Sequence, residues 1–110
     1  MTSPQARKGR RAEIAVAEYL KTFGFIHAEP TRRSGWADDR GDIDGIPGVV
    51  IEVKDHKKHD LPGWLRELEA EVENAGAQTG VLIVKRRGCT DPADWYAVTT
   101  LADFATLIGD

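Results

Sequence analysis

The chain has 110 residues, of which 41% are hydrophobic and 30% are charged, and its formal net charge at pH 7 is −3. This composition is typical of a globular protein and excludes a disordered chain. No apolar run approaches the roughly 20 residues of a transmembrane helix, which excludes a membrane-spanning protein of the helical class.

The same features predict the organisation and the compartment of the protein. The length predicts one domain over residues 1–110 with a single modest core. No apolar stretch of the signal-peptide kind follows the basic N-terminus, and the one cysteine, Cys89, excludes an internal disulfide. We therefore expect a cytoplasmic protein (in the host cytoplasm if the chain is phage-encoded) with no membrane partner.

Charged residues are segregated along the chain. Basic residues gather in residues 1–33, 54–58 and 85–87, whereas acidic residues concentrate in residues 38–44 and 67–73. The net charge argues against a general nucleic-acid binder, but segregation permits one basic face. The pattern is compatible with a phosphate-binding surface and does not by itself establish one.

The first part of the chain is predicted to contain one long helix. Apolar residues recur at helical spacing over residues 6–23, and Gly24 then favours the end of a helix. Residues 25–28 can form a short strand, and a polar loop with two glycines follows over residues 32–42.

The rest of the chain is predicted to alternate between strands and helices. Strands over residues 43–46 and 49–54 are separated by a Pro-Gly turn, which is typical of a hairpin. The later predicted elements are a helix over residues 62–75, a strand buried on both faces over 81–85, a strand over 95–99 and a closing helix over 101–108. This order predicts an α/β domain with a central mixed sheet flanked by helices.

Two charged residues, Glu52 and Lys54, end the apolar strand over residues 49–54. Residues two apart in a strand project from the same face, so these side chains lie side by side while Val53 faces the opposite way. Buried charges are costly unless they are paired or bound to a metal. The two residues therefore form either an ion pair at the end of a strand or part of an active site.

Asp42 favours the active site, because a tight hairpin turn would bring it close to Glu52 and Lys54. Two carboxylates and the backbone carbonyl of Val53 form a hard-oxygen site suited to Mg²⁺, or to Mn²⁺ in its place. Such a cation polarises a phosphodiester and lowers the pKa of a bound water. Lys54 can position that water or offset charge on the phosphate. This arrangement indicates phosphodiester hydrolysis.

The same residues carry a family resemblance. Asp42 followed by Glu52-Val53-Lys54 resembles the signature of the PD-(D/E)XK nuclease superfamily, with Gly41 in place of the proline before the first acid. The segments Arg-Lys-Gly at 7–9, Ala-Glu at 12–13 and Phe-Gly-Phe at 23–25 resemble the opening of archaeal-type Holliday junction resolvases and their phage relatives. The resemblance extends from residue 7 to the strand over 81–85, and it implies a restriction-endonuclease-like fold.

The resemblance also implies roles for single residues. Asp42 and Glu52 would bind the metal, and Glu13 would join them from the first helix. Lys54 would be catalytic, and Ser34 would match a serine in the loop before the first acid. Enzymes of this family are homodimers that nick opposing strands of a four-way junction. The implied partners are therefore branched DNA and a second copy of the chain.

Basic residues near these positions are the predicted DNA contacts. Cations at the start of a helix oppose the helix macrodipole, so a phosphate partner gives a reason for a basic first turn. Other basic residues lie in the loop before the first acid or directly after the strand over 49–54. The predicted contacts are Arg7, Lys8, Arg10, Arg11, Arg32, Arg33, Lys57 and Lys58.

Plainer interpretations remain open for several residues. Glu13 alone would be a solvated helix acid, and Asp44 is the nearest substitute if Asp42 is not the ligand. Trp64 is expected in the core or at a dimer interface rather than as a platform for a base. His56 and His59 with the distant Cys89 fall short of a four-ligand zinc site. Residues 85–87 are either solvated or in contact with phosphate.

The function also has alternatives. The favoured function is a Mg²⁺-dependent DNA endonuclease that resolves Holliday junctions or other branched DNA. A nuclease of different DNA specificity would carry the same signature, because the signature encodes phosphodiester chemistry rather than DNA shape. A DNA-binding module of the same fold without cleavage is a further alternative, as is a protein unrelated to nucleic acids in which the pattern is fortuitous.

Overall fold

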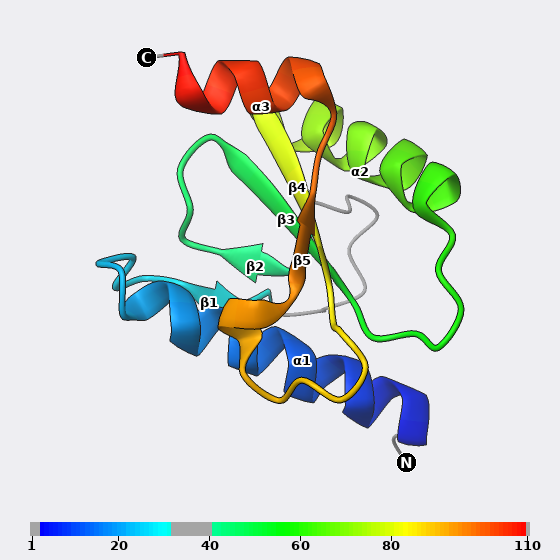
Figure 1. The fold of residues 1–110 in the computed structure, drawn as a ribbon. Helices are drawn as coiled ribbons and strands as arrows, with labels where there is room; N and C mark the ends of the chain where they lie inside the picture. Colours follow the sequence, from blue (N-terminus) through cyan, green and yellow to red (C-terminus); the bar gives the residue numbers. More distant parts are fainter. Residues whose placement is uncertain (1–2, 32–40, 110) are drawn as a thin grey trace.

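A computed structural model gives the structure of the protein over residues 3–31 and 41–109. The elements are α1 (Pro4–Lys21), β1 (Glu29–Pro30), β2 (Ile43–Asp44), β3 (Val49–Lys54), α2 (Leu61–Ala75), β4 (Thr79–Val84), the 3-10 helix η1 (Pro92–Asp94), β5 (Tyr96–Val98) and α3 (Leu101–Ile108). Strand β4 lies between β3 and β5, parallel to β3 and antiparallel to β5, while β1 and β2 form a separate antiparallel pair (Figure 1). The α/β architecture and a mixed sheet are therefore confirmed, although the strands form two sheets rather than one.

The two long helices begin and end where side chains or glycine satisfy the backbone. The Ser3 hydroxyl accepts a hydrogen bond from the Ala6 N–H at 3.1 Å, and the Asp60 carboxylate accepts one from the Gly63 N–H at 3.1 Å. Such caps pair amides that have no partner within the helix. Helix α2 ends at Gly76, whose φ of 64° is a conformation that glycine adopts without strain.

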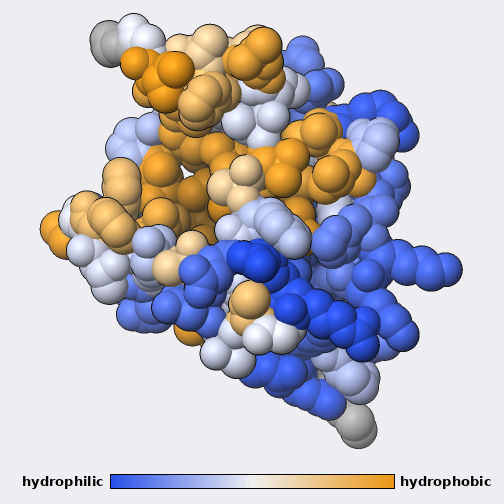
Figure 2. All heavy atoms as spheres, in the orientation of Figure 1, coloured by the Kyte–Doolittle hydropathy of each residue, from blue (hydrophilic) through white to orange (hydrophobic). Residues whose placement is uncertain are grey.

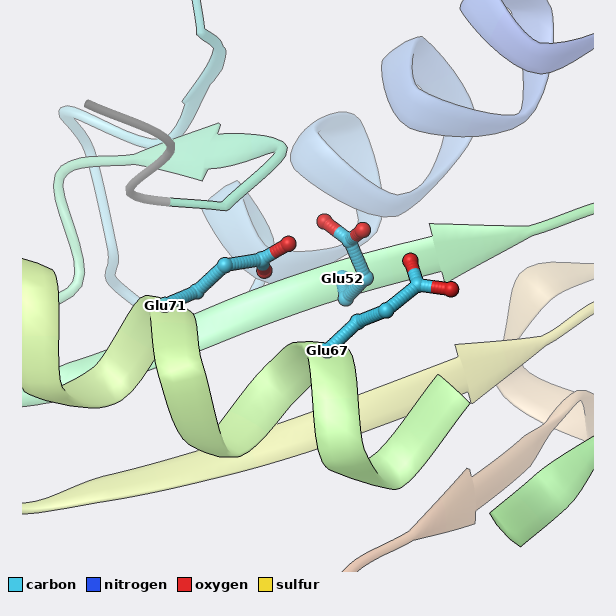
Figure 3. A group of neighbouring side chains, drawn as sticks. All are labelled: Glu52, Glu67 and Glu71. Carbon is cyan, nitrogen blue, oxygen red and sulfur yellow. The ribbon is translucent and has the colours of Figure 1, made fainter. Parts of the chain in front are cut away.

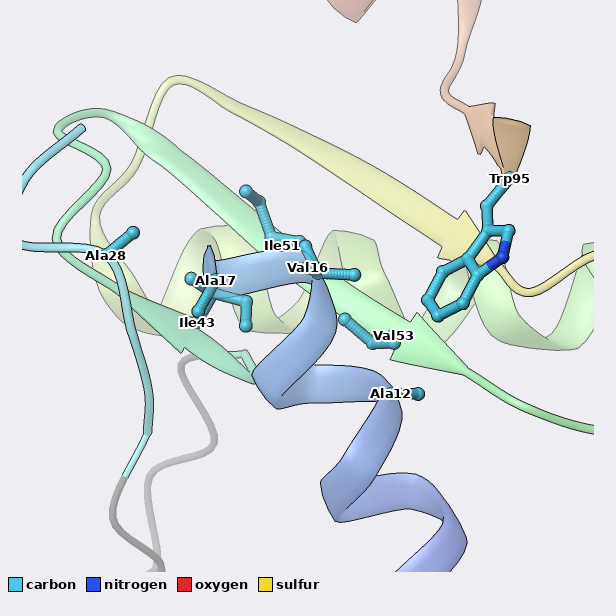
Figure 4. Packing of buried hydrophobic residues seen from close by; sticks show 8 residues of the cluster. All are labelled: Ala12, Val16, Ala17, Ala28, Ile43, Ile51, Val53 and Trp95. Atoms are coloured by element: carbon cyan, nitrogen blue, oxygen red, sulfur yellow. The ribbon is translucent and has the colours of Figure 1, made fainter. Parts of the chain in front are cut away.

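Different helices cover the two faces of β3. Ile51 and Val53 pack in one core cluster with side chains of α1, as Figure 4 shows, whereas Val50 packs in a second cluster with α2. Because side chains alternate along a strand, Glu52 and Lys54 project on the same side as Val50. The strand therefore directs its two charged residues toward α2.

The predicted pairing of residues 43–46 with β3 is wrong, because β2 pairs with β1 instead. The cause lies at Gly45, which has a φ of 89° and approaches the His27 carbonyl so closely that any side chain would collide with it. A hydrogen bond of 2.7 Å from the Asp42 N–H to the Ile51 carbonyl nevertheless holds the chain beside β3. The turn thus places Asp42 beside β3 without forming a ladder of hydrogen bonds between strands.

Other element boundaries also differ from expectation. Residues 25–28 form turns, and the strand follows them as β1. Strand β4 begins two residues before the predicted range and includes Gly80. A Cβ atom at Gly80 would lie 2.7 Å from Val72 and 2.8 Å from Leu68, so glycine is what allows α2 to pack closely on this strand. The predicted strand over 95–99 is shortened because η1 precedes it.

The surface is divided between apolar and hydrophilic regions. Figure 2 shows apolar residues around α3 and hydrophilic residues over the lower part, where α1 begins. Large exposed hydrophobic side chains on α3 are Leu101, Phe104, Leu107 and Ile108. Among the helices described, none has the length and apolar character needed to cross a membrane.

Candidate active site

Asp42 is fixed against the backbone of β3. Its Oδ2 atom accepts a hydrogen bond of 2.8 Å from the Val53 N–H, and its own N–H donates to the Ile51 carbonyl. Asp42 is only 5% exposed. The side chain is therefore held beside Glu52, the residue that precedes Val53, as the sequence predicted.

Gly41 occupies a backbone conformation that proline cannot adopt. Its φ is 97°, and a Cβ atom would lie 2.7 Å from Val50 Cγ1 and 3.0 Å from the Ile51 carbonyl oxygen. Proline fixes φ near −65° and cannot adopt this conformation. The departure from the signature is thus a requirement of the backbone that places Asp42.

Glu52 lies in an environment that disfavours its charge. Burial is the largest cause, followed by the charge of Asp42, a hydrogen bond with Asp42 and the charge of Glu71, and together these raise the pKa of Glu52 to about 10, although Lys54 acts in the opposite direction. Glu52 Oε1 is buried and has no hydrogen-bond partner among residues 3–31 and 41–109. Without a further cation, burial and the neighbouring acids therefore favour the neutral form of Glu52.

Lys54 lies between two carboxylates. Its Nζ atom is 3.7 Å from Glu52 Oε2 and 3.5 Å from Glu67 Oε2, and it also lies 5.8 Å from the centre of the Trp64 ring. The side chain of Lys54 is 16% exposed. Glu52 and Lys54 thus form the ion pair at the end of a strand that the plainer interpretation expects, but further acids surround this pair.

Sequence reasoning missed two glutamates of α2. Glu67 and Glu71 each offer a carboxylate oxygen, and these and one of Glu52 all lie within 4.8 Å of one another (Figure 3). Glu71 is 4% exposed, so it does not belong to a solvated acidic face. A signal was present: Glu71 lies seven residues after Trp64 and three after Leu68, which is helical spacing for the buried face.

Glu13 reaches the same region from α1. It is 5% exposed, which makes the alternative of a solvated acid wrong, and Arg10 Nη1 lies 3.6 Å from its Oε1. Glu13, Asp42, Glu52 and Val53 line one cleft of about 980 Å³. Within the described part of the chain, Glu13 is not one of the three carboxylates that meet within 4.8 Å.

The predicted DNA contacts divide into three groups. Lys8, Arg10 and Lys57 line the cleft that holds the carboxylates. Arg7, Arg11 and Lys58 are exposed but do not line it. The predicted residues Arg32, Arg33 and Ser34 lie outside the described residues.

A second cleft continues the first. It has a volume of about 520 Å³ and shares Lys8, Asp55, His56 and Lys57 with the larger one. Its other lining residues are His59, Lys85, Arg86, Arg87, Gly88 and Tyr96. The two clefts form a continuous depression that leads from the carboxylates to a basic surface.

The structure decides three of the plainer alternatives. Asp44 is exposed and accepts a hydrogen bond of 3.1 Å from Thr31, so it does not replace Asp42. Trp64 is 7% exposed and belongs to the core, as expected. The described residues place no group of three His, Cys or acidic ligands around His56 or His59.

The donor set fits a hard divalent cation. Glu52, Glu67 and Glu71 supply carboxylate oxygens that lie together, and Mg²⁺ and Mn²⁺ prefer such oxygens. Asp42 supplies a further carboxylate beside Glu52 but, within the described residues, is not one of these three. The buried Glu52 Oε1 lacks a hydrogen-bond partner among the described residues, which is the condition that a bound cation would relieve. The residues present are therefore suited to holding Mg²⁺.

Comparison of the chain with family models, curated proteins and solved structures found no match in any of the three. The resemblance to PD-(D/E)XK nucleases therefore stays a prediction based on the residues that carry it.

Proposed function

We propose that this protein is a Mg²⁺-dependent DNA endonuclease that hydrolyses phosphodiesters, with branched DNA such as Holliday junctions as its substrate. One observation carries the proposal. The hydrogen bond from the Val53 N–H to Asp42 sets Asp42 beside Glu52, and Lys54 lies 3.7 Å from Glu52 in the same cleft. This arrangement supports the D…E-x-K resemblance on which the proposal rests.

Each residue has a role in the proposed reaction. Asp42 and Glu52 would hold the cation, which when bound supplies a Lewis acid for the phosphate and a water of lowered pKa. Lys54 would donate hydrogen bonds to the attacked phosphate or to that water. Lys8 and Lys57, at the rim of the cleft, would contact the phosphates on either side of the cleaved bond.

The second cleft supports DNA rather than a small phosphate ester as the substrate. Lys85, Arg86 and Arg87 continue the basic surface beyond the carboxylates, as a polyanion with several phosphates would need. The Arg86 guanidinium lies 5.2 Å from the ring centre of Tyr96, which is 48% exposed. The preference for branched DNA rests on the family resemblance.

The finer fold and the oligomeric state belong to the same proposal. A restriction-endonuclease-like domain is supported by the parallel pairing of β3 and β4, with α2 as the connection between them. A homodimer is supported by apolar side chains left exposed on α3, where Leu101 is 81% and Ile108 is 68% exposed.

The main alternative is a DNA-binding module of this fold that does not cleave. The basic surface would serve such a module equally well, but the buried carboxylates would not. Burying several acids costs free energy, and DNA binding alone does not offset that cost because carboxylates repel phosphates.

Cleavage of a labelled four-way junction beside linear duplex of the same sequence tests the proposal. Wild type, Glu52→Gln and the control Glu69→Gln, which changes an exposed acid of α2, are compared in Mg²⁺ and in EDTA. We expect paired nicks at the junction that require Mg²⁺ and are lost in Glu52→Gln alone. Equal cutting of both substrates would contradict the junction preference, and tight binding without any cutting would contradict the nuclease.

A further inference from the structure

Helix α2 presents two acids to the charged end of β3. Figure 3 shows the side chains of Glu67 and Glu71 extending from α2 toward Glu52. Glu71 and Glu52 are 4% and 6% exposed, whereas Glu67 lies at the surface with 55% of its side chain exposed. One carboxylate oxygen of each lies within 4.8 Å of the other two. Glu52 and Glu71 are therefore brought together where little of either residue is exposed.

This distance suits a shared cation. Two oxygens bound to one Mg²⁺ at about 2.1 Å are at most about 4.2 Å apart, and those bound to Ca²⁺ at about 2.4 Å are at most about 4.8 Å apart. Small rotations of long side chains would bring the three oxygens within the Mg²⁺ limit. No shift of the backbone is needed to bring the carboxylates of Glu52 and Glu71 together, because α2 already packs on the face of β3 from which Glu52 projects.

A second, independent feature points to a ligand at this place. Glu52 Oε1 is buried and has no hydrogen-bond partner among the described residues, while the Lys54 ammonium lies 3.7 Å from the other oxygen, Oε2. A buried acceptor without a donor is rare in native proteins and commonly marks an ion or a water. This acceptor belongs to Glu52, the residue of β3 toward which Glu67 and Glu71 of α2 extend.

We propose that Glu71 is a metal ligand and that the divalent cation binds between α2 and β3, held by Glu52 and Glu71 with Glu67 as the exposed third carboxylate. The presence of a divalent cation rests on the proposed function. The inference concerns which helix supplies the carboxylate ligand in addition to Asp42 and Glu52. The resemblance assigns that ligand to Glu13 on the first helix, whereas the structure assigns it to the helix that follows the signature strand.

Binding of Mn²⁺ by the full-length chain, followed by calorimetry and by the metal-induced rise in melting temperature, tests this assignment. The variants are Glu71→Gln, Glu13→Gln and the control Glu69→Gln, which lies on the exposed side of α2. We expect Glu71→Gln to weaken Mn²⁺ binding at least about tenfold, as the loss of a charged ligand does. We expect Glu13→Gln and Glu69→Gln to bind Mn²⁺ nearly as wild type does.

Hydrogen exchange of the wild type gives a second measurement that needs no variant. A cation that joins α2 to β3 should slow exchange of the amides of α2 around Glu71 as well as those of β3. Protection confined to residues 42–54, together with wild-type Mn²⁺ affinity in Glu71→Gln, would overturn the assignment and leave the proposed nuclease intact. Absence of Mn²⁺ and Mg²⁺ binding by the wild type would overturn both.

Discussion

The carboxylate of Asp42 accepts a hydrogen bond from the backbone N–H of Val53 at 2.8 Å, so an acid that precedes β2 is fixed near the C-terminal end of β3. Together with the hydrogen bond from the Asp42 N–H to the Ile51 carbonyl, it replaces the ladder that a hairpin would have formed. It places Asp42 beside Glu52 on the strand edge, and it does so through the side chain that would also hold the metal. Folding and site assembly therefore depend on the same residue.

Asparagine and alanine at position 42 should separate these two roles. Asp42→Asn keeps an oxygen that can accept the Val53 N–H, whereas Asp42→Ala leaves a buried donor unpaired, which costs about 1–3 kcal/mol. We expect Asp42→Ala to lower the free energy of unfolding by that amount relative to Asp42→Asn in urea titrations, and both variants to lose cleavage. Equal stability of the two variants would show that the hydrogen bond does not hold this turn.

Replacing Gly41 should destabilise this protein, even with the proline of the signature that the sequence resembles. Proline at position 41 cannot adopt a φ of 97°. Alanine is strained by the same φ, and its Cβ atom would also lie 2.7 Å from Val50 Cγ1. We expect Gly41→Ala to lose at least about 2 kcal/mol of stability.

Gly24→Ala is the matched control, since Gly24 has a φ of 98° and a Cβ atom added there would have no heavy atom within 4 Å. It carries the backbone strain alone and should lose about 1 kcal/mol. If the two alanine variants unfold at the same urea concentration, the close contact at Gly41 has no energetic weight.

The stability of the metal-free protein should fall as pH rises. The pKa of Glu52 is raised from 4.5 to about 10 in the folded state, so folding takes up a proton between these values. The contribution of Glu52 to the free energy of unfolding is fully present below its pKa in the unfolded chain. It is lost as pH rises through its pKa in the folded protein, with a slope of up to about 1.4 kcal/mol per pH unit. We expect wild type to lose stability relative to Glu52→Gln from about pH 5 to about pH 9 in EDTA. Parallel pH profiles would contradict the raised pKa.

Basic residues at the rim of the clefts should set the salt dependence of DNA binding. Lys57 lines both clefts, so Lys57→Ala should weaken binding to a four-way junction and lower the slope of log K against log salt by about one. Lys21→Ala is the control, because Lys21 pairs with Glu29 at the far end of α1. An unchanged slope in Lys57→Ala would place the DNA elsewhere.

The local pattern of β3 was sufficient to predict that Glu52 and Lys54 share one face of the strand. Alternation along a strand placed Glu52 and Lys54 on one face. Asp42 was expected beside them through a hairpin, whereas it reaches β3 through hydrogen bonds without strand pairing. Strand β3 and helix α3 have the predicted bounds. These features depend on residues close in sequence, and local sequence therefore predicts them.

The features that sequence reasoning missed depend on contacts between distant segments. Gly45 allows β2 to pair with β1 because its backbone lies against the His27 carbonyl. Gly80 is part of β4 because the absence of a side chain there lets α2 pack closely on the strand. Glu71 was grouped with an acidic run, although its helical spacing from Trp64 places it on the buried face. Its proximity to Glu52 follows from how α2 packs on β3, which no local pattern encodes.

Single-turnover cleavage of a four-way junction by Lys54→Ala tests the central claim most directly. The control is Lys58→Ala, which removes an exposed lysine that does not line the cleft. With saturating protein and Mg²⁺, we expect Lys54→Ala to bind the junction but to cut it at least about 100-fold more slowly than wild type, and Lys58→Ala to cut normally. Cleavage by Lys54→Ala at the wild-type rate would contradict the assignment of catalysis to this site.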